Sequence, residues 1–210
     1  MFFVLVLTTP LLGQQYTVYS NGPINGTTDA WTINSGFVVS NTFTVGMGGA
    51  DVNGLVFGAW AFPGDVLESS QIQITSSEFG GTTFFSGTVN FTQSGCSSNQ
   101  YGFNVCTETS DLFGPVNLAS GTYWLNLDNA VVNTGDPIYW DENSGPSSAS
   151  ENSVGTIPSE AFTVLGASTC TCCDNSPNCY QPAEPGSLVL LASGVLGLAG
   201  FWSAWWRRFF

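Results

Sequence analysis

Carboxylates are the main groups in this chain of 210 residues that could do chemistry. The sequence contains no histidine, so Ser-His-Asp and Cys-His arrangements are not available within it. Its two basic residues, Arg207 and Arg208, stand near the C-terminal end, so the residues before them contain no lysine for Ser-Lys or Schiff-base chemistry. A carboxylate pair, as in glycoside hydrolysis, remains. The candidates are Asp136, Asp141, Glu142 and Glu160. No residue pattern distinguishes a general acid among them, so we favour solvated loop carboxylates and predict that the protein is not an enzyme.

Calcium is the one cofactor that these acids suggest. The densest cluster of side-chain oxygens consists of Asp136, Asp141, Glu142 and Asn143. Calcium takes six to eight oxygen ligands, and the loops of a β-sandwich can supply them. No EF-hand spacing is present, so a polar turn is the favoured alternative to a metal site.

Tryptophans offer a second kind of site, because aromatic rings can stack on sugar rings. The candidates are Trp31, Trp60, Trp124 and Trp140. Trp124 has the parity opposite to Tyr123, Leu125 and Leu127 in a predicted strand, so we expect it to point away from the core and consider it as a ligand contact. Burial in the core is the favoured alternative, because tryptophan is usually largely buried.

The chain contains six cysteines, an even number that favours disulfides in an exported protein. They are Cys96, Cys106, Cys170, Cys172, Cys173 and Cys179. A bridge between Cys96 and Cys106 would close a hairpin. The other four lie close together in sequence, and a four-thiolate metal site is the alternative there, although the paired C-x₂-C spacing of a zinc fold is absent.

Short stretches of alternating apolar and polar residues run through positions 14–166. Ile72 and Ile74 alternate with glutamines, and the run from Phe85 to Phe91 keeps its large residues on one parity. Turn residues separate eight to eleven such stretches, with a loop at 94–99 and an irregular segment at 143–159. We predict an all-β domain, a jelly-roll-like β-sandwich, followed by a Cys-rich linker over 167–181.

Both ends of the chain indicate export. Residues 1–13 have the short apolar run of a signal peptide but no basic residues before it, so we interpret them as a signal peptide truncated at its N-terminus. Residues 186–206 are uncharged and long enough for a single transmembrane helix. Arg207 and Arg208 follow it, which predicts that this end is cytoplasmic and that the domain lies on the other side of the inner membrane.

The tail also resembles a known signal. Pro182, Ala183, Glu184 and Pro185, then the apolar run, then Arg207 and Arg208, resemble a PEP-CTERM sorting signal over residues 182–210. The family motif reads Pro-Glu-Pro, and Ala183 replaces its first proline. The resemblance implies an exported substrate of an exosortase-type processing enzyme. The stretches 19–23, 121–125 and 139–145 look like those of exported PEP-CTERM proteins to which no activity is assigned. An ordinary membrane anchor is the alternative.

The net charge of −13 limits the partners of the domain. Nucleic acid is excluded, because its binding depends on Lys and Arg side chains that neutralise phosphates. We predict a membrane-anchored protein, at least transiently, that reaches the cell surface or the extracellular matrix and has a structural role. Extracellular polysaccharide is a further candidate partner. The alternatives are a carbohydrate- or calcium-dependent binding module on the same anchor and, with less support, a carboxylate-based glycosidase.

Overall fold

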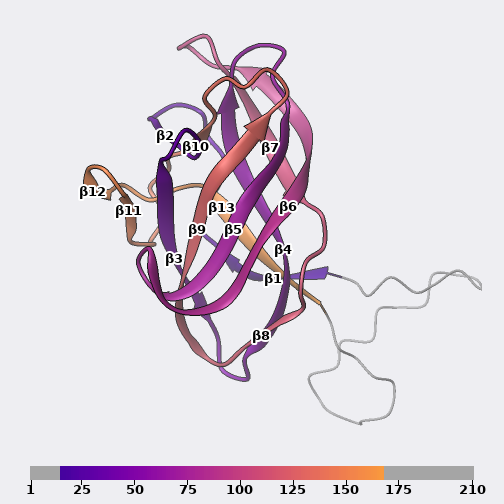
Figure 1. The fold of residues 1–210 in the computed structure, drawn as a ribbon, viewed down its shortest axis with the longest axis vertical. Helices are drawn as coiled ribbons and strands as arrows, with labels where there is room; N and C mark the ends of the chain where they lie inside the picture. The colour runs from indigo at the N-terminus through magenta and orange to yellow at the C-terminus, as the bar shows by residue number, and fades with distance from the viewer. Residues whose placement is uncertain (1–14, 168–210) are drawn as a thin grey trace, which may run out of the picture. The chain divides into compact units, whose positions relative to one another are not determined.

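The computed structural model describes residues 15–167, and this part of the chain is all-β (Figure 1). It contains thirteen strands and no helix. The strands are β1 (Gln15–Ser20), β2 (Ala30–Thr32), β3 (Val38–Val45), β4 (Ala50–Ala61), β5 (Leu67–Ser77), β6 (Gly80–Ser98), β7 (Asn104–Ser110), β8 (Val116–Leu118), β9 (Gly121–Val132), β10 (Tyr139–Asp141), β11 (Ala149–Glu151), β12 (Gly155–Ile157) and β13 (Phe162–Ala167).

All strand pairs are antiparallel, and one curled sheet contains them in the order β1-β13-β4-β7-β6-β5-β9-β3-β11-β12. The long strand β6 makes the curl. Its first part pairs with β5, from Asn90 back to Gly80, and its second part pairs with β7, from Phe91 to Ser98. The short strands β2 and β10 pair with each other, and β10 also pairs with β4.

The core lies between the two parts of this sheet. Strands β3, β5 and β9 contribute Phe43, Ile72 and Leu127, which are completely or almost completely buried. Strands β4 and β13 contribute Phe57 and Phe162 from the other part. Burying each such side chain stabilises the fold by roughly 1.5–3 kcal/mol.

Aromatic contacts join β10 to the core. The Trp140 ring packs edge-on against Phe57 and Phe162, at centroid distances of 5.8 and 5.5 Å, and is completely buried. β10 is therefore anchored from within the core, and its last residue, Asp141, is held at a fixed place at the end of the strand.

The all-β prediction is confirmed, and so is the period-2 pattern of β5, in which Ile72 and Ile74 are buried between half-buried glutamines. Two boundaries were wrong. The segment 143–159 contains the strands β11 and β12, and β6 continues through most of the predicted loop at 94–99. The Ser- and Gly-rich composition of these segments predicts loops. The segments form strands because β11 pairs with β3 and the end of β6 pairs with β7.

The predicted signal peptide, the four C-terminal cysteines, the sorting motif and the predicted membrane helix lie outside the described residues. Between residues 15 and 167, no helix is long and apolar enough to cross a membrane.

Candidate functional site

Three of the four candidate carboxylates come together where the end of β10 meets the connection before β13. Asp141 ends β10, Glu142 follows it, and Glu142 and Glu160 form an isolated antiparallel bridge. The backbone N–H of Ala161 donates to the carbonyl of Asp141 at 2.7 Å, which holds the two segments together. All three side chains are buried. Asp136 is an exposed residue in the β9–β10 connection, where its carbonyl accepts a hydrogen bond from Asn34.

The carboxylate of Asp141 is 0 % exposed and accepts three N–H donors. The backbone N–H groups of Asn25 and Gly26 donate at 2.8 and 2.9 Å, and Trp60 Nε1 donates at 2.6 Å. Burial raises the pKa of Asp141, and these three hydrogen bonds oppose the rise. Asp141 therefore ties the β1–β2 connection to β4 through one buried carboxyl group.

A glycine makes room for this arrangement. A Cβ atom on Gly58 of β4 would stand 2.9 Å from the Cβ of Asp141 and 2.8 Å from a methyl carbon of Ile24. Real Cβ atoms do not approach other carbons so closely, so a side chain at Gly58 would push both residues away.

The two glutamates differ in their contacts. Glu142 accepts a hydrogen bond from Trp31 Nε1 at 3.3 Å, whereas neither carboxyl oxygen of Glu160 has a hydrogen-bond partner. Glu160 is 0 % exposed. Its burial, and then the charges of Glu142, Asp141 and Asp29, raise its pKa well above the usual range. The pKa of Glu142 is raised chiefly by burial, with a smaller opposing effect of Trp31.

Amide side chains hold the backbone around these acids. Asn143 Nδ2 donates to the carbonyl of Asn21 at 2.8 Å, and Asn21 Nδ2 donates to the carbonyl of Glu160 at 2.7 Å. The Ser159 hydroxyl donates to Asn143 Oδ1 at 3.1 Å. These buried bonds satisfy the polar backbone of connections that would otherwise be costly to bury.

The predicted calcium ligands do not form an open set of oxygens. The Asp141 oxygens accept N–H donors, and Asn143 Oδ1 accepts from Gly145 and Ser159. No three His, Cys, Asp or Glu side chains in residues 15–167 are grouped so that they could hold a metal ion. The hydrogen bonds of these side chains give the calcium hypothesis no structural support, and it stays a prediction.

A carboxylate pair for hydrolysis has the same difficulty. Asp141 and Glu160 have no exposed surface, and the hydrogen bonds of Asp141 go to structural donors. Such groups can stabilise loops, but a sugar could reach them only if the surrounding connections opened.

The four candidate tryptophans are placed differently from one another. Trp140 is completely buried, and its indole N–H donates to the carbonyl of Ala161 at 3.0 Å. Trp60 is 4 % exposed and Trp31 is half-buried, and both donate to the acids described above. Trp124 is half-buried, whereas Tyr123, Leu125 and Leu127 are buried in the core, as their parity predicted.

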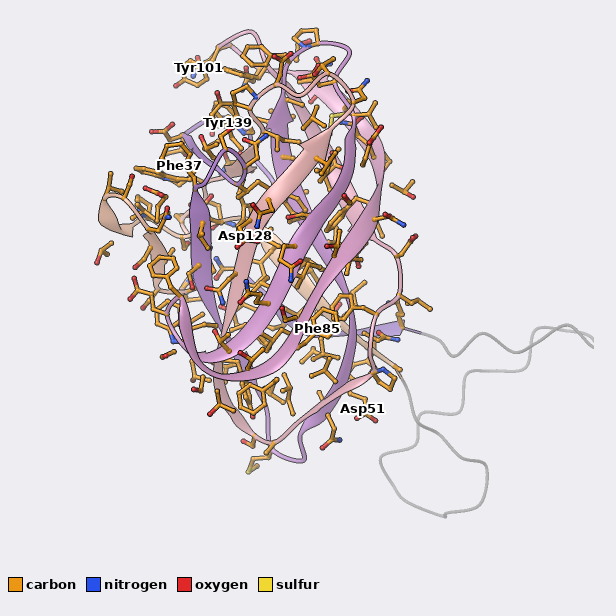
Figure 2. The ribbon with its side chains drawn as sticks, viewed as in Figure 1. Phe37, Asp51, Phe85, Tyr101, Asp128 and Tyr139 are labelled. Carbon is orange, nitrogen blue, oxygen red and sulfur yellow. A yellow bond between two sulfur atoms is a disulfide. The ribbon has the colours of Figure 1, made fainter. Side chains whose placement is uncertain are left out.

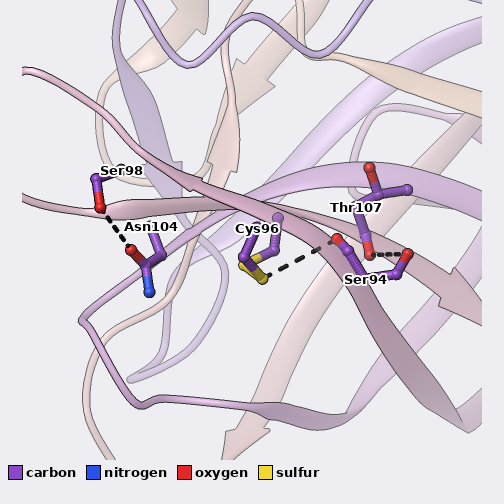
Figure 3. The surroundings of a disulfide bond; sticks show 6 residues. Ser94, Cys96, Ser98, Asn104 and Thr107 are labelled. Carbon is purple, nitrogen blue, oxygen red and sulfur yellow. Dashed lines mark hydrogen bonds between the residues drawn. A yellow bond between two sulfur atoms is a disulfide. The ribbon is translucent and has the colours of Figure 1, made fainter.

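The disulfide lies at the β6–β7 hairpin, joining Cys96 to Cys106 with Cα atoms 4.1 Å apart (Figure 3). The prediction of this hairpin bridge is confirmed. Next to it runs a groove of about 630 Å³, formed by residues 24–27 of the β1–β2 connection and by residues of the hairpin between 95 and 107. Sequence analysis missed the groove, because its two walls are far apart in the chain. The Cys96–Cys106 spacing was the only sign of it.

The chain matches no protein-family profile, and no curated protein is significantly similar to it in sequence.

Proposed function

We propose that this chain is an exported protein of the cell surface or extracellular matrix, with a structural role and no catalytic activity of its own. The observation that carries the proposal is the order of features in the tail. The segment Pro182 to Pro185 precedes the uncharged run 186–206, and Arg207 and Arg208 follow it. By resemblance, an exosortase-type enzyme at the inner membrane would process the chain near Ala183, Glu184 and Pro185.

Two properties of the described domain support this location. The Cys96–Cys106 disulfide suits an oxidising compartment outside the cytoplasm. The chain before Arg207 has no lysine, arginine or histidine, so the domain presents a negative surface that favours solubility.

A structural role is supported by the use of the buried acids. The oxygens of Asp141 accept hydrogen bonds from N–H groups of the fold, and Glu160 has no exposed surface. We further propose that the domain is a jelly-roll-like β-sandwich. This proposal is supported by β6, which pairs with β5 in one part of the curled sheet and with β7 in the other.

The test is the intact mass of the protein from its own host, with mapping of the C-terminal peptide. A sorting signal predicts a mature chain that ends between Ala183 and Pro185. A Glu184→Ala, Pro185→Ala variant is expected to keep the tail to Phe210, whereas the matched control Ser187→Ala is expected to be processed normally. A wild-type chain that still ends at Phe210 would show a permanent anchor and would remove the main support for exosortase processing.

A further inference from the structure

We infer that the groove between the β1–β2 connection and the β6–β7 hairpin binds a neutral oligosaccharide, with the exposed ring of Tyr101, which follows the lining residue Gln100, as the stacking surface. This inference goes beyond the proposed surface role and does not depend on the processing of the tail. It also places sugar binding away from Trp124, the aromatic residue that the sequence suggested.

The lining of the groove has the hydrogen-bonding groups of a sugar site. None of its residues is charged, and most have a hydroxyl or amide side chain. Ser97 and Gln100 are exposed and have no side-chain hydrogen bond within residues 15–167. Asn99 has a structural role instead, because its Oδ1 accepts from the N–H groups of Tyr101 and Phe103, both at 3.0 Å, and its Nδ2 is buried. Neutral donors and acceptors are therefore available for sugar hydroxyl groups.

Tyr101 supplies an aromatic surface beside these groups. It is 53 % exposed, and its ring stacks on Trp60 with centroids 5.5 Å apart and planes 22° from parallel. Its hydroxyl donates to the carbonyl of Thr27 at 3.4 Å, which ties the ring to the opposite wall of the groove. Trp60 covers one face of the ring, so the exposed surface of Tyr101 is available to a sugar ring.

More aromatic rings continue from Tyr101 across the same end of the domain. Phe103 packs against Trp60, Phe62 and Tyr139, with centroid distances of 5.9, 4.9 and 5.5 Å. Tyr101 and Tyr139 lie at this end in Figure 2. Phe62 is 39 % exposed, so part of this aromatic cluster reaches the surface.

The chemistry of the groove selects among ligand classes. A sugar ring has a C–H face that packs on an aromatic ring and hydroxyl edges that hydrogen-bond to amides and hydroxyls. The net charge of −13, without a cation before Arg207, disfavours anionic polysaccharides. A cationic ligand would need a carboxylate in the groove, and the lining has none. A neutral oligosaccharide needs neither a cation nor a carboxylate in the groove, so it fits the lining.

Asp141 and the disulfide hold the groove in shape before a ligand arrives. Asp141 binds the N–H groups of Asn25 and Gly26 in one wall and the indole of Trp60 beneath Tyr101. The Cys96–Cys106 bond fixes the hairpin that forms the other wall, as Figure 3 shows. Preorganised walls reduce the entropy that binding must overcome.

The experiment is affinity electrophoresis of the full-length chain in a detergent without a sugar headgroup. The gels contain galactomannan, mixed-linkage β-glucan, xyloglucan or dextran, with alginate as the anionic comparison. We expect retardation in at least one neutral gel and none in alginate. Tyr101→Ala should weaken that binding at least 10-fold, whereas Tyr101→Phe, which keeps the ring, should retain it.

The matched control is Tyr16→Ala, which removes another exposed tyrosine (43 %, against 53 % for Tyr101) from β1 and should bind like the wild type. Wild-type binding by Tyr101→Ala, or equal losses in Tyr101→Ala and Tyr16→Ala, would overturn the assignment to this groove. Retardation only in alginate would overturn the neutral ligand class. No retardation of the wild-type chain in any of the gels would overturn the inference as a whole. The wild-type chain carries the intact groove and an exposed Tyr101, so a failure to bind could not be blamed on a damaged fold.

Discussion

Two regions of the domain each contain a completely buried carboxyl group, and these two groups, Asp141 and Glu108, differ in their hydrogen bonds. At the end of β10, Asp141 is 0 % exposed and accepts three N–H donors. In the middle of β7, Glu108 is also 0 % exposed, and neither of its oxygens has a hydrogen-bond partner. Glu108 stands opposite Phe57 of β4 and Gln93 of β6 in the sheet.

The difference shows that hydrogen-bond donors oppose the effect of burial on the pKa of an acid. Burial raises the pKa of both residues, but at Asp141 three hydrogen bonds oppose the rise. At Glu108 burial raises the pKa to about 7, and the only opposing effect is a weak one from the nearby Gln93 amide, which does not form a hydrogen bond to either oxygen. The hydrogen bonds of Asp141 favour its charged form, whereas Glu108 is accommodated best as a neutral acid.

The largest expected effect comes from removing the carboxyl group of Asp141, which accepts three N–H donors. Asp141→Ala would leave the N–H groups of Asn25 and Gly26 and the indole N–H of Trp60 without their acceptor, and each such buried donor costs about 1–3 kcal/mol. We expect the free energy of unfolding in urea to fall by about 3–5 kcal/mol. Asp141→Asn, which keeps one acceptor oxygen, should lose less.

The control for this change is Glu68→Ala, which removes an exposed carboxylate and should change the free energy by less than about 0.5 kcal/mol. An Asp141→Ala variant as stable as this control would show that the three hydrogen bonds do not stabilise the fold.

A smaller effect, with a defined pH dependence, is expected at Glu108. Its pKa of about 7 in the folded state lies above the ordinary value of 4.5, so between these pH values the folded chain holds a proton that the unfolded chain has lost. The stability that Glu108 contributes in acid is therefore lost as the pH rises through about 7, by about 3 kcal/mol in total. Glu108→Gln should flatten the pH profile of unfolding by that amount and be more stable than the wild type at pH 8.

Unfolding in urea at a series of pH values from 4 to 8 measures this profile. The exposed Glu78→Gln serves as the matched control and should leave the profile parallel to that of the wild type. If the profile of Glu108→Gln also runs parallel to that of the wild type, the pKa of Glu108 is not raised in the folded chain. The contrast between Glu108 and Asp141 would then be wrong.

The smallest effect tests how precisely the donors of Asp141 are placed. Gly26 has a φ of +64°, and a Cβ there would stand 2.5 Å from a methyl carbon of Val105. Gly26→Ala should therefore displace the N–H group that binds Asp141 and cost about 1–2 kcal/mol. Thermal unfolding compares it with Gly135→Ala, which has a similar backbone conformation (φ +83°) but no neighbour within 4 Å. Equal losses in the two variants would mean that the contact with Val105 is not important.

The candidate site was only partly predictable. Asp141 and Glu142 are adjacent in sequence, and their proximity was evident, but Glu160 joins them through a bridge between distant segments. The same folding leaves Asp136 outside the cluster, because the β9–β10 turn places it beside Asn34. Trp60 was considered as a sugar contact, but it is only 4 % exposed, and its ring stacks on Tyr101.

The sequence by itself determined the properties that depend on composition and local alternation. Hydrophobic residues at every second position made strands such as β5, and the cysteine spacing predicted the hairpin bridge. Only the tertiary structure decided which acids receive donors and where a groove opens. The N–H group that Asp141 binds at Gly26 comes from 115 residues earlier in the chain. Hydrogen-bond partners at such separations are set by the curl of the sheet, and no local pattern encodes them.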